Sequence, residues 1–129
     1  MANRFNDWMK QAEADLAAAL DSLAGGHFEW SCFAAQQAAE KAVKALYMKH
    51  GADAWGHTIT PLIGGLRGAN AAGEELIACA KTLDKHYIPT RYPNGFDAGA
   101  PVDFYTRKEA ETACECARKI IDFCARALR

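Results

Sequence analysis

The chain has 129 residues, of which half are apolar and 24% are charged, and its formal net charge is −1. This length suits a single domain, residues 1–129, that buries its own core, and the small net charge gives no global reason to expect a nucleic acid or a membrane surface as partner, although a local basic patch is compatible with it. No stretch approaches the roughly 20 apolar residues that a membrane-spanning helix needs, and the first residues, MANRFNDWMKQ, lack the apolar run of a signal peptide.

The first two predicted helices form a hairpin. Apolar residues recur at three- and four-residue steps from about residue 6 to residue 24, and Gly25-Gly26 ends that helix. A second helix is predicted from Phe28 to about His50, and the short linker requires an antiparallel return. The second helix carries a stripe of small and apolar residues that is expected to face the core: Phe28, Cys32, Ala35, Ala39, Ala42 and Leu46. Its other side is expected to face water: Glu29, Gln37, Glu40, Lys41 and Lys44.

Three large side chains interrupt this polar side, namely Trp30, Phe33 and Met48. Two interpretations stay open for them. A further helix of the same bundle covers them, or they contact another chain, because large aromatic residues are typical interface anchors. Trp30 and Phe33 are therefore candidate residues of a partner or dimer interface.

The second half of the chain predicts shorter elements. Thr60-Pro61 reads as an N-cap and first residue of a short helix that ends near Arg67, after a loop that contains Trp55 and His57. A helix from about Gly73 to His86 precedes an irregular segment, residues 87–104. Thr106 and Glu109 predict a capping box for a last helix that runs to about Leu128. Without any strand pattern, the chain is predicted to be an all-α, antiparallel up-and-down bundle of four main helices plus a short one.

Five cysteines are present, and none forms a CxxC pair. Cys114 and Cys116 lie two positions apart on a predicted helix, so their side chains point to nearly opposite sides and cannot share a metal ion. We expect all five to be small buried or half-buried thiols in a reducing cytoplasm, with no metal site and no cofactor.

Three segments together resemble the HEPN domain, the higher eukaryotes and prokaryotes nucleotide-binding domain. They are QQAAEKAVKAL at residues 36–46, His57 before the short helix, and LDKHYIPTRYP at residues 83–93. The resemblance extends from about Trp8 to about Ala125. It implies a homodimeric helical bundle that binds nucleotide or RNA phosphate, and a complex with a minimal nucleotidyltransferase that acts as a toxin–antitoxin pair.

Other members of that family are ribonucleases in which an Arg is followed four to six residues later by a His. Here Arg91 is followed by residues 92–97, which contain no His. The resemblance therefore favours a binding module over an enzyme. The alternative is a metal-independent ribonuclease in which Arg91 works with His57 or His86 as the base.

Arg91 and Tyr92 lie between Pro89 and Pro93, so their backbone is expected to be extended. We expect Arg91 to hold a phosphate with its planar fork of donors and Tyr92 to stack on a base. The alternative is that Arg91 pairs with Asp84 and fixes the loop to the bundle.

Three more residues are candidates for the same phosphate site. Lys85 and His86 precede the loop and would enlarge a basic mouth, or they would simply complement the dipole at the end of a helix. His57 lies just before a helix start, where it would bind an anion or pack as a structural residue. Lys41 and Lys44 would approach the same mouth or remain solvated.

Overall fold

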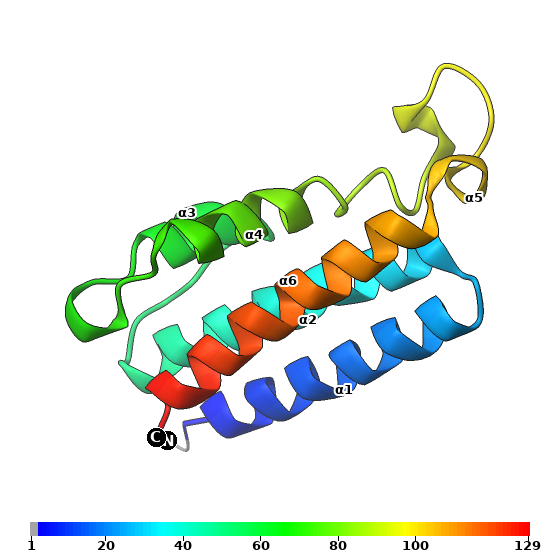
Figure 1. The fold of residues 1–129 in the computed structure, drawn as a ribbon. Coiled ribbons are helices and arrows are strands. Elements are labelled where there is room, and N and C mark those ends of the chain that lie inside the picture. The colour runs from blue at the N-terminus through cyan, green and yellow to red at the C-terminus, as the bar shows by residue number, and fades with distance from the viewer. Residues whose placement is uncertain (1–2) are drawn as a thin grey trace.

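Four long helices build the computed structural model, which describes residues 3–129 (Figure 1). They are α1 (Phe5–Ala24), α2 (Phe28–Lys49), α4 (Glu74–Asp84) and α6 (Arg107–Ala127). Two short helices, α3 (Ile59–Gly64) and α5 (Pro101–Phe104), and two 3₁₀ turns, η1 (Gly68–Asn70) and η2 (Pro93–Gly95), lie in the connections. The described residues contain no strand, so the all-α prediction is confirmed.

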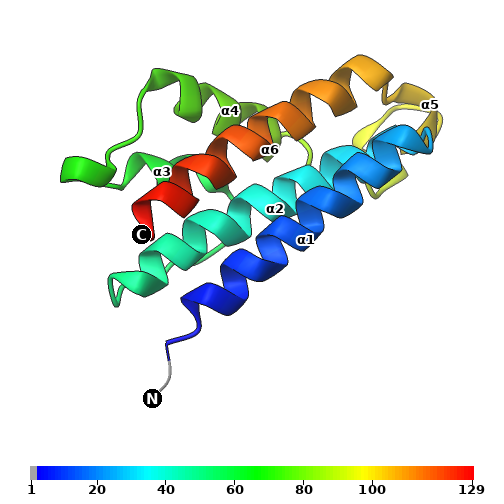
Figure 2. The same cartoon turned by 60° about the horizontal axis from the view of Figure 1, so that its bottom comes forward.

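The helices lie in three layers. α1 forms one outer layer, α2 and α6 lie side by side in the middle, and α3 and α4 form the other outer layer (Figures 1 and 2). α2 contacts every other α-helix of the described chain. The predicted hairpin of α1 and α2 is confirmed.

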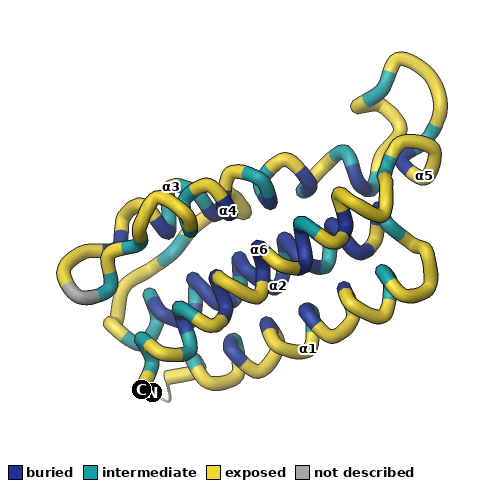
Figure 3. The backbone as a smooth tube through the Cα atoms, viewed as in Figure 1, coloured by how far each residue is buried: buried dark blue, intermediate teal, exposed yellow. Residues whose placement is uncertain are grey.

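The core between α1 and α2 is rich in very small side chains. Buried residues recur from turn to turn on the sides of the helices that face one another (Figure 3). Small side chains let two helix backbones approach closely, which increases the number of dispersion contacts per residue. Seven alanines of these two helices are fully buried: Ala12, Ala19, Ala35, Ala38, Ala39, Ala42 and Ala45.

The cysteines also belong to the core. All five are buried and free. Burial raises the pKa of the Cys32, Cys116 and Cys124 thiols to about 12, because an apolar environment disfavours the thiolate. They are therefore packed as small apolar groups, as the sequence predicted.

The short elements differ from their predictions. α3 begins at Ile59 rather than Pro61, because its first N–H groups are capped from a distance by Asp84 and not by the side chain of Thr60. The irregular segment contains a helical turn, α5, that the sequence did not predict. The capping box of α6 is confirmed, since Thr106 Oγ1 accepts from the Glu109 N–H at 3.2 Å and the Glu109 carboxylate accepts from the Thr106 N–H at 3.1 Å.

The polar side of α2 is less exposed than its pattern predicts. Glu29 and Glu40 are buried, although both were expected to face water. Over the described residues no helix covers Trp30, which stays 53% exposed, and Phe33 is contacted instead by the segment after α4. The interpretation that a further helix covers these aromatic residues is therefore wrong.

Candidate functional site

Arg91 is held in a cage of three aromatic rings, those of Phe33, Tyr87 and Tyr92. Its guanidinium carbon lies 4.5, 4.6 and 5.1 Å from their respective centroids. Cation–π contacts of this kind contribute about 0.5–2 kcal/mol each. The Arg91 Nε also donates to the Tyr87 carbonyl at 2.9 Å. The position of the guanidinium is therefore fixed from several sides.

The two terminal nitrogens of Arg91 are left with spare donor capacity. Among residues 3–129 no carboxylate lies within ion-pair distance of them, and they donate no hydrogen bond to a described group. The interpretation that Arg91 pairs with Asp84 is wrong, because the Asp84 carboxylate accepts from Ile59 and Thr60 instead. A fixed guanidinium without an anionic partner is suited to hold an anion from outside the chain.

The cage depends on a turn after α4. The Arg91 N–H donates to the Ile88 carbonyl at 3.1 Å, and the buried Thr90 hydroxyl donates to the His86 carbonyl at 2.6 Å. Arg91 therefore lies in a turn rather than in the predicted extended backbone. Tyr92 is extended, with φ −129° and ψ 133°, as expected for a residue that precedes proline.

His57 joins this cage through Tyr87. The two rings are stacked with centroids 4.7 Å apart and planes 14° apart. His57 Nδ1 lies 3.2 and 3.3 Å from the two Glu40 oxygens, and the Gln36 amide donates to the His57 carbonyl at 2.8 Å. A carboxylate oxygen at this distance can accept from an Nδ1–H, and in the neutral imidazole that tautomer leaves Nε2 as the acceptor nitrogen.

Glu40 is the buried centre of this polar network. Its side chain is only 5% exposed, and Lys44 Nζ donates to it at 2.9 Å. The carboxylate therefore has a cation and an imidazole as partners, which is what a buried charge requires. The role of Glu40 was not predicted, because the helical pattern of the sequence places this residue among solvated ones.

Lys85 and His86 do not join the Arg91 cage. They line a separate groove with Lys108 and Glu109 against α6. His86 is buried with its ring edge-on to Tyr105 at 5.5 Å, and its Nδ1 has no hydrogen-bond partner among the described residues. Burial lowers the pKa of His86 below its usual value, because the charged imidazole is disfavoured there. A buried neutral ring does not enlarge a basic mouth.

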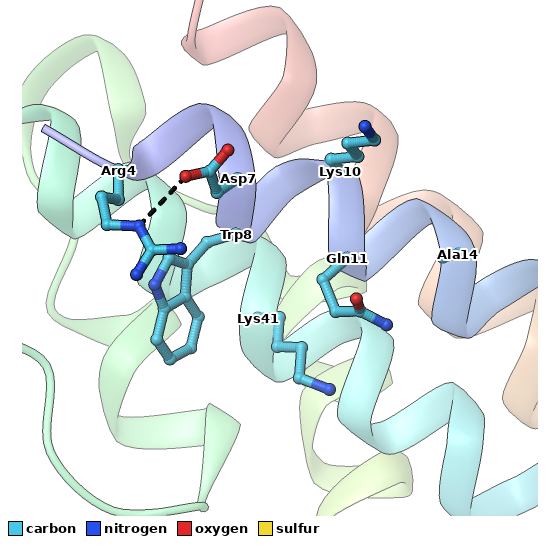
Figure 4. A pocket seen from close by; sticks show the side chains of 7 residues that line it. All are labelled: Arg4, Asp7, Trp8, Lys10, Gln11, Ala14 and Lys41. Carbon is cyan, nitrogen blue, oxygen red and sulfur yellow. Dashed lines mark hydrogen bonds and ion pairs between the residues drawn. The ribbon is translucent and has the colours of Figure 1, made fainter.

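Two grooves lie where α1 meets the polar side of α2, and Trp8 lines both. The first is lined by Arg4, Trp8, Lys10 and Lys41, together with Asp7, Gln11 and Ala14, and Figure 4 shows the Arg4–Asp7 ion pair beside the Trp8 indole. The second, called the Trp8–Trp55 groove below, is lined by Trp8, Lys44, Met48 and residues 52–57. Lys41 and Lys44 are each paired with a carboxylate, of Asp15 and Glu40 respectively, so neither is a free surface lysine.

Among the described residues, no group of three His, Cys, Asp or Glu side chains is arranged to hold a metal ion. No helix of that part of the chain has both the length and the apolar character that a membrane crossing requires.

Comparison with known proteins shows which family the chain resembles. A model of the HEPN domain matches residues 5–127. The chain is 47% identical to TT1696 from Thermus thermophilus, with a TM-score of 0.94 over 98% of this chain and 99% of that one. It is 38% identical to ST0689, an archaeal HEPN homologue, with a TM-score of 0.84 over 99% of this chain and 100% of that one.

Two further relatives are similar over most of their length. An HEPN domain protein from Thermotoga maritima is 39% identical, with a TM-score of 0.75 over 93% of this chain and 95% of that one. A protein of Methanocaldococcus jannaschii named "Putative toxin MJ1304" is 27% identical in an alignment of 124 positions, which covers 89% of this chain and 82% of that protein.

Proposed function

Because the chain belongs to the HEPN domain family, we propose that it is a binding module that holds the phosphate of a nucleotide or an RNA on Arg91. The observation that carries this proposal is the guanidinium fixed by Phe33, Tyr87 and Tyr92 with no carboxylate partner in the described chain. In this site Arg91 donates to the phosphate, the half-exposed Tyr92 stacks on a neighbouring base of an RNA, and His57 lines the approach.

We further propose that the module is one half of a toxin–antitoxin pair, works as a homodimer and binds a minimal nucleotidyltransferase in the cytoplasm. The similarity to a protein named as a toxin supports the first point, and the half-exposed Trp30 offers an anchor for a second chain. Five buried free thiols are compatible with a reducing compartment. Affinity capture with the genomic neighbour and sedimentation of the purified protein test the partner and the dimer. A monomer that captures no nucleotidyltransferase contradicts both.

Titration of a labelled single-stranded RNA tests the phosphate site. We expect Arg91→Ala to weaken binding roughly 10- to 100-fold, because a charge-assisted hydrogen bond to a phosphate contributes about 1.5–3 kcal/mol, and to lower the salt dependence by about one counterion. Arg91→Lys keeps the charge but loses the planar fork, so it should restore only part of the affinity.

Arg107→Ala is the matched control for that titration. Arg107 also stacks on an aromatic ring, with its guanidinium carbon 5.0 Å from the Phe28 centroid, but it lies at the exposed start of α6. The proposal requires that this variant binds like the wild type. Equal losses of RNA affinity in the two variants would show that only the overall positive charge matters. An unchanged affinity in Arg91→Ala would contradict the phosphate site.

A second candidate function, a metal-independent ribonuclease, is favoured by one observation. The Glu40 carboxylate orients His57 so that Nε2 is available as a proton acceptor. In such a reaction Nε2 takes the proton of the 2′-hydroxyl, its oxygen attacks phosphorus, and the bond to the 5′-oxygen breaks. The protonated imidazole then returns a proton to that leaving oxygen, and a 2′,3′-cyclic phosphate remains.

Incubation with RNA in the presence of a chelator tests this candidate. Cleavage with a cyclic-phosphate end, lost in His57→Ala and Arg91→Ala but kept in His27→Ala, would establish it; His27 is exposed in the α1–α2 turn. Absence of cleavage across tRNA and mRNA substrates would leave the binding module alone.

A further inference from the structure

We propose that the Trp8–Trp55 groove receives the nucleobase of the nucleotide whose phosphate lies on Arg91. This inference rests on the proposed function, because the phosphate site is its starting point. It adds the place of the base, and it identifies the ligand as a nucleotide rather than a simple phosphate ester.

The groove has the size and lining of a site for a planar ring. Its volume is about 420 Å³, within the usual range of small-molecule sites. Two indoles from different parts of the chain, Trp8 of α1 and Trp55 of the loop, line it together with the thioether of Met48. Aromatic side chains that stack on bases are the common feature of proteins that bind nucleotides and single strands without pairing.

Trp55 is more exposed than folding alone would favour. Its side chain is 83% exposed, the largest value among the exposed large apolar residues of the described chain. The backbone beside it is nevertheless anchored, because the His57 carbonyl, two residues later, accepts from the buried Gln36 amide at 2.8 Å. The exposed indole therefore lies on an anchored segment at the mouth of the groove. Such an exposed apolar surface is typical of a site that a ligand covers.

His57 connects the groove to the Arg91 cage. Its ring lines the groove and also stacks on Tyr87, 4.7 Å away, and the Arg91 guanidinium carbon lies 4.6 Å from the same Tyr87 ring. A base in the groove and a phosphate on Arg91 are therefore separated by one imidazole and one phenol ring. A ligand with a base, a ribose and a phosphate has this extended form, whereas inorganic phosphate does not.

Tryptophan fluorescence tests the assignment, because the chain has only three tryptophans. In the Trp30→Phe background, Trp8 and Trp55 alone report on the groove. AMP, GMP, CMP and UMP are titrated in parallel with ribose 5-phosphate, which carries the phosphate without a base. We expect at least one nucleotide to quench the emission and to bind about tenfold or more tightly than ribose 5-phosphate.

Trp55→Ala separates the contribution of the base from that of the phosphate. Because Trp55 is highly exposed, the variant should fold like the wild type, and circular dichroism checks this. By calorimetry it should weaken nucleotide binding about tenfold and leave ribose 5-phosphate binding unchanged, whereas Arg91→Ala should weaken both. Val102→Ala, at a large apolar residue of α5 that is 69% exposed, is the control and should change neither.

Three results would overturn the inference about the base without contradicting the phosphate site on Arg91. Nucleotide affinity that is lost in Arg91→Ala but kept in Trp55→Ala leaves the phosphate site and removes the base from the groove. A loss in Tyr92→Ala without one in Trp55→Ala places the base on Tyr92 instead. A dimer that Trp55→Ala converts to a monomer, at unchanged nucleotide affinity, assigns the groove to a second copy of the chain. If no nucleotide binds the wild type, the proposed function fails as well.

Discussion

Asp84, the last residue of α4, caps the start of α3 through Thr60, which precedes it by 24 residues. One Asp84 oxygen accepts both the Thr60 N–H at 2.9 Å and the Thr60 hydroxyl at 2.5 Å, and the other accepts the Ile59 N–H at 2.6 Å. One carboxylate therefore joins α3 and α4, the two helices of the same outer layer. The Asp84 carboxylate is thus engaged at the start of α3, and it makes no ion pair with Arg91 among the described residues.

Removal of this cap should destabilise the fold. Asp84→Ala is expected to lower the free energy of unfolding by about 2–3 kcal/mol, because three hydrogen bonds to a charged acceptor are lost and two backbone donors are left without a partner. Thr60→Val removes only the hydroxyl bond and should cost about 1 kcal/mol. Urea denaturation at neutral pH measures both, and equal costs would contradict the capping role.

The Glu40 network should respond to loss of charge without loss of shape. Glu40→Gln is expected to cost about 2 kcal/mol of stability, because Lys44 loses its partner in a nearly buried site. It should also release the tautomer preference of His57, which two-dimensional ¹H–¹⁵N spectra of the imidazole report directly. Glu13→Gln, on the exposed side of α1, is the control. An unchanged His57 spectrum would show that Glu40 does not orient the ring.

His86 should make stability depend on pH. Burial lowers its pKa in the folded state, with the charge of Lys85 acting in the same direction and that of Glu109 opposing it. The unfolded chain therefore binds a proton from about pH 6.5 downward while the folded chain resists it. The stability contributed by the neutral ring is present above about pH 6.5 and is lost as the pH falls through the lowered folded pKa.

The measurement is the free energy of unfolding between about pH 7 and pH 5. It should fall in the wild type and fall less in His86→Phe, where nothing titrates at this position. His27→Ala, which removes an exposed imidazole, should keep the wild-type slope. A slope that is the same in all three proteins would show that His86 titrates alike in both states.

The thiols should be unreactive until the bundle opens. Burial raises the pKa of Cys32 and Cys124 to about 12, so both are neutral as well as covered at about pH 8. A disulfide reagent should modify none of the five cysteines rapidly in the folded protein and all five in urea. Ala18→Cys adds an exposed thiol on α1 and should react at once. Rapid modification of a native cysteine would indicate local opening of its helix.

Local sequence patterns predicted the long helices, whereas contacts between residues distant in sequence determine the short elements. The periodicity of α1, α2 and α6 and the capping box at Thr106 involve residues within a few positions of one another, so they are readable from the sequence. The start of α3 was wrong by two residues because its cap comes from Asp84. No local signal identifies such a cap.

The candidate site shows the same division. Arg91, Tyr92 and His57 were predicted as site residues. In the structure Arg91 and His57 contact the Tyr87 ring, and Tyr92 contacts the Arg91 guanidinium. Phe33 completes the cage from α2, far away in sequence, and was predicted only as an interface residue. Lys85 and His86 were grouped with Arg91 because they are neighbours in sequence, but the chain turns after α4 and carries them toward α6.

The α1–α2 core has a consequence for experiments that survey substitutions. An alanine scan, the usual way to map a core, reports nothing at Ala12, Ala35, Ala39 or Ala42, which are already alanine and fully buried. Larger residues are the informative changes there, because an added methyl group in a tightly packed interface forces the helices apart at a cost of about 1–3 kcal/mol. In a survey of all single substitutions, the positions with the smallest buried side chains should therefore tolerate the fewest replacements. The replacements that still allow folding should lie mostly on the opposite, exposed face of α1.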